Sequence, residues 1–135
     1  DVVESRIGRN RMDKVYAWQS MLDLGIRTMG GSDAPVVSFN ILENIYFAVT
    51  RKNINGQPAE GWLPEEKLSL GEALRLFTKY AAYGSYTENE NGTVELGKNA
   101  DFVVLSEDIY KSQPEHIKDI QVDMTIVAGK TVYER

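Results

Sequence analysis

The stretch Gly30-Gly31-Ser32-Asp33-Ala34-Pro35 decides the fold of this chain. The apolar run Ile26 to Met29 leads into it, and a helical pattern begins near Ser38. Glycines permit a sharp turn, and Pro35 fixes its own φ and removes a donor. The layout predicts a strand, a tight turn and a helix, with Asp33 at the carboxyl end of the strand. In open α/β sheets and (β/α)8 barrels this end carries the chemistry, so Asp33 is the candidate catalytic residue.

Asp33 also has a purely structural interpretation. An aspartate before Ala-Pro and just upstream of a helix is common as a turn residue or as a helix cap. Spacing alone favours this interpretation, because short motifs of this kind produce false positives.

Composition restricts the class of protein. The chain has 135 residues, enough for one domain with a core, and a net charge of −5, which argues against a nucleic-acid partner and an anionic membrane surface. The absence of cysteine excludes disulfides and thiolate metal sites. No apolar run has the length of a membrane span, and no signal peptide is visible, so we expect a cytoplasmic protein. The chain begins with Asp1 rather than Met, which we interpret as a cut end, with a processed natural start as the alternative.

Helices are expected on both sides of the central stretch. Asp13 is the expected N-cap of a first helix that carries Val15, Trp18 and Leu22 on one face and ends at Gly25.

Two further helices have clear start signals. Asn40 to Glu43 reads as a capping box, with Ser38 as a competing cap, and this helix ends near Arg51-Lys52. Ser69 to Glu72 is a second capping box, followed by an apolar stripe that ends near Gly84.

The composition changes near residue 90, where β patterns replace helical ones. The apolar run Phe102 to Leu105 predicts a buried strand. Val122 to Val127 and Thr131 to Tyr133 flank a short glycine-containing turn and predict a hairpin. One helical turn is expected at Pro114 to Ile117. We therefore expect an α/β half over residues 1–90 and a β half over residues 91–135.

Three motifs in order resemble the metal-dependent amidohydrolases, closest to amidohydrolase family 3. They are the Gly-Ser-Asp-Ala-Pro stretch, the run Gly92-Thr93-Val94-Glu95-Leu96-Gly97-Lys98-Asn99-Ala100-Asp101 before Phe-Val-Val-Leu, and the closing Val127-Ala128-Gly129-Lys130-Thr131-Val132-Tyr133. The resemblance implies the C-terminal fragment of a (β/α)8 amidohydrolase barrel, with its last strand and flanking helices in residues 1–90. Residues 91–135 are then strands of the accessory β-sandwich.

The resemblance also implies a function for Asp33. In the family this acid binds the metal and handles the proton of the attacking water, so Asp33 is the predicted catalytic and metal-binding residue. The intact enzyme is expected to use a divalent metal, zinc, to hydrolyse amide, urea-like or cyclic imide C–N bonds in small molecules.

The chain by itself lacks the metal ligands that this chemistry requires. A catalytic zinc site needs about three protein ligands, but the only histidine is His116, in a polar segment where we expect it at the surface. We therefore expect an inactive fragment that binds no metal tightly, lacks its N-terminal barrel partner and self-associates. The alternative is a stand-alone, non-catalytic binding or assembly module derived from the same fold.

Overall fold

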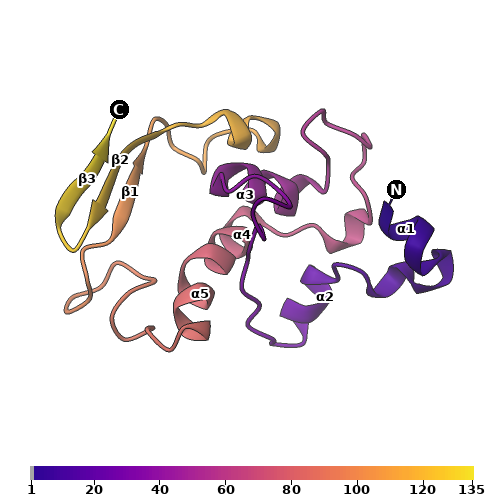
Figure 1. Cartoon of the computed structure of the whole chain (residues 1–135), viewed down its shortest axis with the longest axis horizontal. Coiled ribbons are helices and arrows are strands. Elements are labelled where there is room, and N and C mark those ends of the chain that lie inside the picture. Colours follow the sequence, from indigo (N-terminus) through magenta and orange to yellow (C-terminus); the bar gives the residue numbers. More distant parts are fainter. Residues whose placement is uncertain (1) are drawn as a thin grey trace.

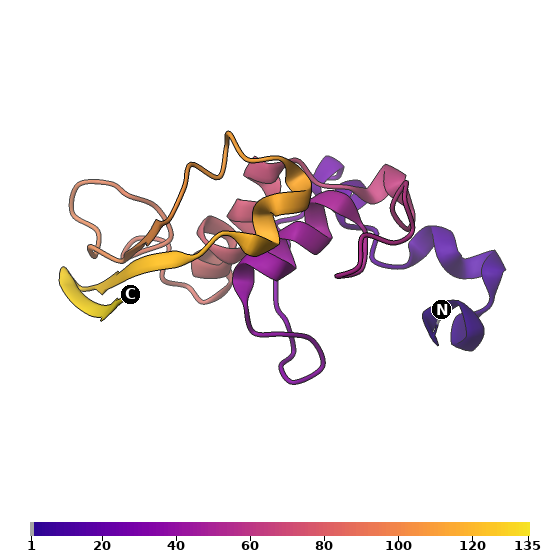
Figure 2. The same cartoon turned by 90° about the horizontal axis from the view of Figure 1, so that it is seen from above.

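The computed structural model describes residues 2–135 and shows an elongated molecule (Figure 1). A small sheet lies at one end, N-terminal helices lie at the other, and the remaining helices lie between them. Seen from above, the two termini again lie at opposite ends (Figure 2).

The helices and strands follow one another in a fixed order along the chain. They are α1 (Val2–Ile7), η1 (Arg9–Lys14), α2 (Trp18–Asp23), α3 (Ile41–Thr50), η2 (Pro64–Glu66), α4 (Leu70–Phe77), α5 (Lys79–Gly84), β1 (Phe102–Leu105), η3 (Pro114–Asp119), β2 (Val122–Val127) and β3 (Lys130–Glu134). The η segments are 3-10 helices.

The sheet is antiparallel in the order β1-β2-β3. The hairpin predicted around Ala128-Gly129 is confirmed, as are the strand at Phe102–Leu105 and the helical turn at Pro114. The predicted burial of β1 is wrong, because Phe102, Val103 and Val104 are each exposed. No second sheet covers them within residues 2–135.

The predicted strand at Ile26 to Met29 is also wrong. These residues form no strand, because a strand requires a neighbour to complete its backbone hydrogen bonds and none lies beside them in the described chain. Immediately afterwards, the N–H of Gly30 donates to the carbonyl of Leu76 in α4 at 3.1 Å. The segment is therefore tied to a helix instead of to a sheet.

The fold class is confirmed only in its coarse form, as helices beside a small antiparallel sheet. Residues 2–135 form neither a (β/α)8 barrel nor a β-sandwich. Both remain part of the proposal for a longer protein, and the division at residue 90 stays a prediction.

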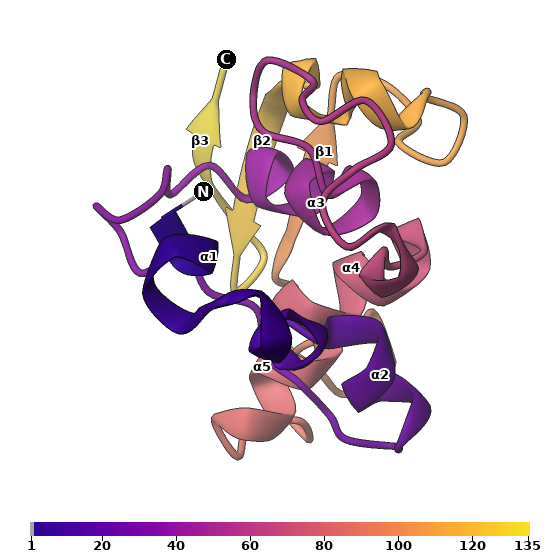
Figure 3. The ribbon, with the colours of Figure 1, turned by 90° about the vertical axis from the view of Figure 1, so that its right-hand side faces the viewer.

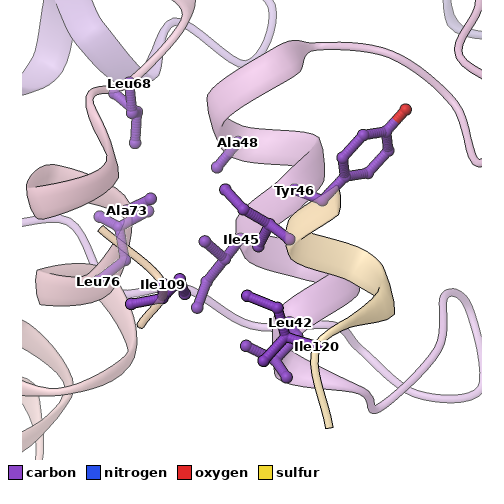
Figure 4. Packing of buried hydrophobic residues seen from close by; sticks show 10 residues of the cluster. Leu42, Ile45, Tyr46, Ala48, Leu68, Ala73, Leu76, Ile109 and Ile120 are labelled. Carbon is purple, nitrogen blue, oxygen red and sulfur yellow. The ribbon is translucent and has the colours of Figure 1, made fainter. Parts of the chain in front are cut away.

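The core lies between α3, α4 and the segment that contains η3, where apolar side chains of α3 point toward both neighbours (Figure 4). Its buried members are Leu42, Ile45, Tyr46, Ala48, Leu68, Ala73, Leu76, Ile109, Ile117 and Ile120. These residues come from both halves of the sequence, so packing joins the α-helical segments to the chain that leads into the sheet.

Side-chain caps fix the starts of α3 and α4. Asn40 is the N-cap of α3, as predicted: its side chain accepts from the N–H of Leu42 at 3.1 Å. The competing cap Ser38 is not the N-cap, and its Oγ accepts from the N–H of Asn40 instead. The predicted box with Glu43 does not form, because the Glu43 carboxylate accepts from the side-chain amide of Asn40 rather than from its backbone N–H. The box at Ser69 and Glu72 is complete. The cap predicted at Asp13 is wrong: Asp13 lies inside η1, and α2 begins only after Ala17.

The single helix predicted from the Ser69 cap to about Gly84 forms as two helices, α4 and α5. Thr78 leaves helical geometry between α4 and α5, at φ −126° and ψ −94°. Within the described residues, no helix combines the length and apolar character needed to cross a membrane.

Candidate active site

Asp33 lies on the turn that follows Gly30-Gly31, at φ 49°. Its carbonyl accepts from the N–H of Val36 at 2.9 Å, which closes the turn. Aspartate tolerates this left-handed conformation better than most residues do. Asp33 does not cap α3, since Asn40 does, and the side chain of Asp33 is exposed. Asp33 thus has the conformation of a turn residue, and its side chain is exposed.

Gly30 brings this turn close to α4. A Cβ at this position would lie 2.6 Å from Cζ of Phe77, so a side chain here would require the Phe77 ring or the segment to shift. Gly30 therefore serves the close approach to Phe77, whereas the left-handed conformation of the turn is adopted by Asp33 and not by Gly30 or Gly31.

The turn forms part of the wall of a cavity of about 650 Å3. The other walls come from one face of α3, the loop from Arg51 to Trp62, the start of α2, and Leu76 and Phe77 of α4. In Figure 3, α3 lies above α4 and α2 lies below it. Asp33 is the only carboxylate among the described residues that line this cavity, and no histidine or cysteine joins it.

The described residues do not make a metal site. No three His, Cys, Asp or Glu side chains within residues 2–135 are grouped so that they could hold an ion. His116 is exposed in η3, as predicted, and does not line the cavity. A catalytic zinc takes about three protein ligands, so this part of the chain supplies at most one, Asp33.

Arg51 is a cavity residue whose position the sequence did not reveal. It is only 6% exposed, and its guanidinium lies over the rings of Trp18, at 4.5 Å, and Trp62, at 5.2 Å. Burial lowers the pKa of Arg51, although the nearby carboxylates of Glu66 and Glu65 oppose this shift. In the sequence, Arg51 is a basic residue at a helix end, and no spacing links it to the two tryptophans.

Comparisons with known proteins place the chain in context. The Amidohydrolase family model matches residues 1–133. Protein YtcJ of Bacillus subtilis is 35% identical over 98% of this chain and 25% of its own length. An N-substituted formamide deformylase of Arthrobacter pascens is 35% identical over 90% of this chain and 22% of its own.

More distant relatives extend the comparison. A 5-methylthioadenosine/S-adenosylhomocysteine deaminase of Caldanaerobacter subterraneus is 30% identical over 87% of this chain and 28% of its own length. The crystal structure of an amidohydrolase from Thermotoga maritima aligns with a TM-score of 0.65 at 20% identity, over 89% of this chain and 26% of that one. The chain thus spans about a quarter of the length of these proteins.

Proposed function

Because the chain belongs to the amidohydrolase family and corresponds to a C-terminal part of family 3, we propose that it is part of a larger hydrolase of non-peptide C–N bonds. The observation that carries this proposal is the placement of Asp33. It is the one carboxylate lining the cavity among the described residues, on the turn that follows Gly30-Gly31.

In this proposal Asp33 moves the proton. Its carboxylate accepts a proton from the attacking water and returns it to the leaving nitrogen, acting first as a general base and then as a general acid. An exposed carboxylate on a turn suits this role, because both water and substrate can reach it.

Members of the family generally depend on a metal. The described residues do not supply a complete ligand set, so we assign the divalent ion, which we propose to be zinc, to the intact enzyme. Asp33 is the ligand that this chain would contribute.

The substrate is proposed to be a small molecule with an amide-like C–N bond. The names of the relatives cover two such reactions: loss of a formyl group from a substituted amine, and deamination of an adenine-containing compound. Substituted formamides and 5-methylthioadenosine are therefore the first substrates to assay.

The test is Asp33→Asn in the full-length enzyme. The amide keeps the size of the side chain but cannot accept the proton, so kcat should fall by about a hundredfold or more. Asp23→Asn is the control, because Asp23 is an exposed carboxylate of α2 that does not line the cavity. Near-normal turnover in Asp33→Asn would show that Asp33 is a structural turn residue and not a catalytic one.

The competing proposal is a stand-alone, non-catalytic module derived from the same fold. The reading frame upstream of Asp1 separates the two. Coding sequence for a His-x-His pair and further barrel units would favour the hydrolase, whereas a start codon just before Asp1 would favour the module.

A further inference from the structure

Arg51 occupies its position at a cost to stability. Its guanidinium is buried, yet no carboxylate of residues 2–135 lies within ion-pair distance of it. Its Nη2 has no hydrogen-bond partner among these residues, and its backbone is left-handed at φ 58°. Buried unpaired donors and left-handed non-glycine residues are unfavourable, and they concentrate at functional sites.

In return, Arg51 connects segments that are far apart in the sequence. Its Nε donates to the carbonyl of Trp62 at 3.0 Å, and its Nη1 donates to the carbonyl of Tyr16 at 3.2 Å. The Cζ of its guanidinium also lies over the rings of Trp18 and Trp62. A single side chain thus joins the end of α3 to the segment before α2 and to the loop before η2.

The residues that Arg51 holds form an aromatic cluster. The ring of Tyr16 meets that of Trp18 at 5.8 Å and that of Trp62 at 6.0 Å, both edge to face. All three rings line the cavity that also contains Asp33. One wall of the candidate active site is therefore aromatic, and Arg51 contacts all three of the residues that form it.

We propose that Arg51 is a positioning residue for substrate recognition: it fixes Tyr16, Trp18 and Trp62 as a wall against which an aromatic substituent on the substrate nitrogen packs. This inference rests on the proposed function. Arg51 acts through the wall and does not touch the reacting atoms, so its loss should affect the affinity for bulky substrates rather than the chemical step.

The test compares two formamides in the full-length enzyme. Arg51→Lys keeps the charge, but a compact ammonium lacks the planar fork that reaches two carbonyls from separate nitrogens while lying over both rings. The KM for N-phenylformamide should rise about tenfold, while the KM for N-methylformamide and both kcat values should stay within about threefold. A residue that merely stabilises the fold would not discriminate between the two substrates.

Arg27→Lys is the matched control. Arg27 also lies over an aromatic ring, that of Tyr83 at 4.4 Å, but it does not line the cavity. Its replacement should leave both KM values unchanged. Arg51→Gly tests the role by chemical rescue, because glycine readily adopts the left-handed φ of this position. In this variant, millimolar ethylguanidinium should restore the KM for N-phenylformamide, whereas ethylammonium should not.

Three results would overturn the inference. They are an unchanged KM in Arg51→Lys, a fall in kcat for both substrates with no change in their relative KM, or no turnover of either formamide by the wild type. If Asp33→Asn abolishes turnover while Arg51→Lys leaves both KM values unchanged, the positioning role fails and the proposed function stands. Full activity in Asp33→Asn would instead contradict the proposed function itself.

Discussion

At the scale of single residues, Glu66 shows how a buried carboxylate is kept charged. Burial raises the pKa of Glu66, but hydrogen bonds from the hydroxyl and N–H of Ser20, together with the Gln19 backbone and the charge of Arg51, outweigh it, and the pKa lies below its usual value. The contribution of Glu66 to stability is therefore present above its unfolded pKa and is lost as pH falls through the folded pKa. Ser20→Ala should lower the free energy of unfolding by about 2 kcal/mol at neutral pH.

The difference in free energy of unfolding between Ser20→Ala and wild type should shrink in acid, below the unfolded glutamate pKa of about 4.3. Urea unfolding at neutral and acid pH, at equal protein concentration, measures it. Ser112→Ala is the control, because Ser112 donates to the exposed Glu107 at 3.0 Å and should cost little. Equal losses in the two variants would contradict the role of burial.

At the scale of elements, α4 depends on its N-terminal cap. The Ser69 Oγ accepts from the N–H of Glu72 at 3.3 Å, and the Glu72 carboxylate accepts from the N–H of Ser69 at 2.8 Å. Ser69→Ala removes the first bond and should destabilise the fold by about 1 kcal/mol in urea unfolding. Ser85→Ala, at the exposed end of α5, should cost under about 0.5 kcal/mol. A similar loss at both sites would show that the cap is not specific.

At the scale of the whole molecule, the sheet is incomplete. β1 and β3 are its outer strands, and apolar residues on both remain exposed, among them Val103 and Val132. Open strand edges and apolar patches favour pairing with another chain. We therefore predict that the 135-residue chain self-associates at low micromolar concentration, measured by sedimentation equilibrium.

A charge on the sheet should reverse this association. Val103→Lys should shift the chain toward monomer, whereas Ile54→Lys, at an exposed apolar position in a loop, should not. A well-ordered wild-type monomer would contradict the prediction and favour the stand-alone module.

The sequence by itself determined the features that depend on neighbours along the chain. The caps at Asn40 and Ser69, the turn between β2 and β3 and the positive φ of Gly25 all follow from hydrogen bonds or backbone preferences within a few residues. The ordered motifs also identified the family, because motifs retain their spacing whatever surrounds them.

Only the tertiary structure decided the features that need distant partners. The segment Ile26 to Met29 has strand character, but no strand forms without a neighbour to bond. The residues of β1 read as buried and are exposed, because no second layer covers them in the described chain. Arg51 reaches Tyr16 across 35 positions and Trp62 across 11, so no local pattern could place it in the cavity. Burial and long-range contacts are properties of packing, and packing depends on which surfaces meet.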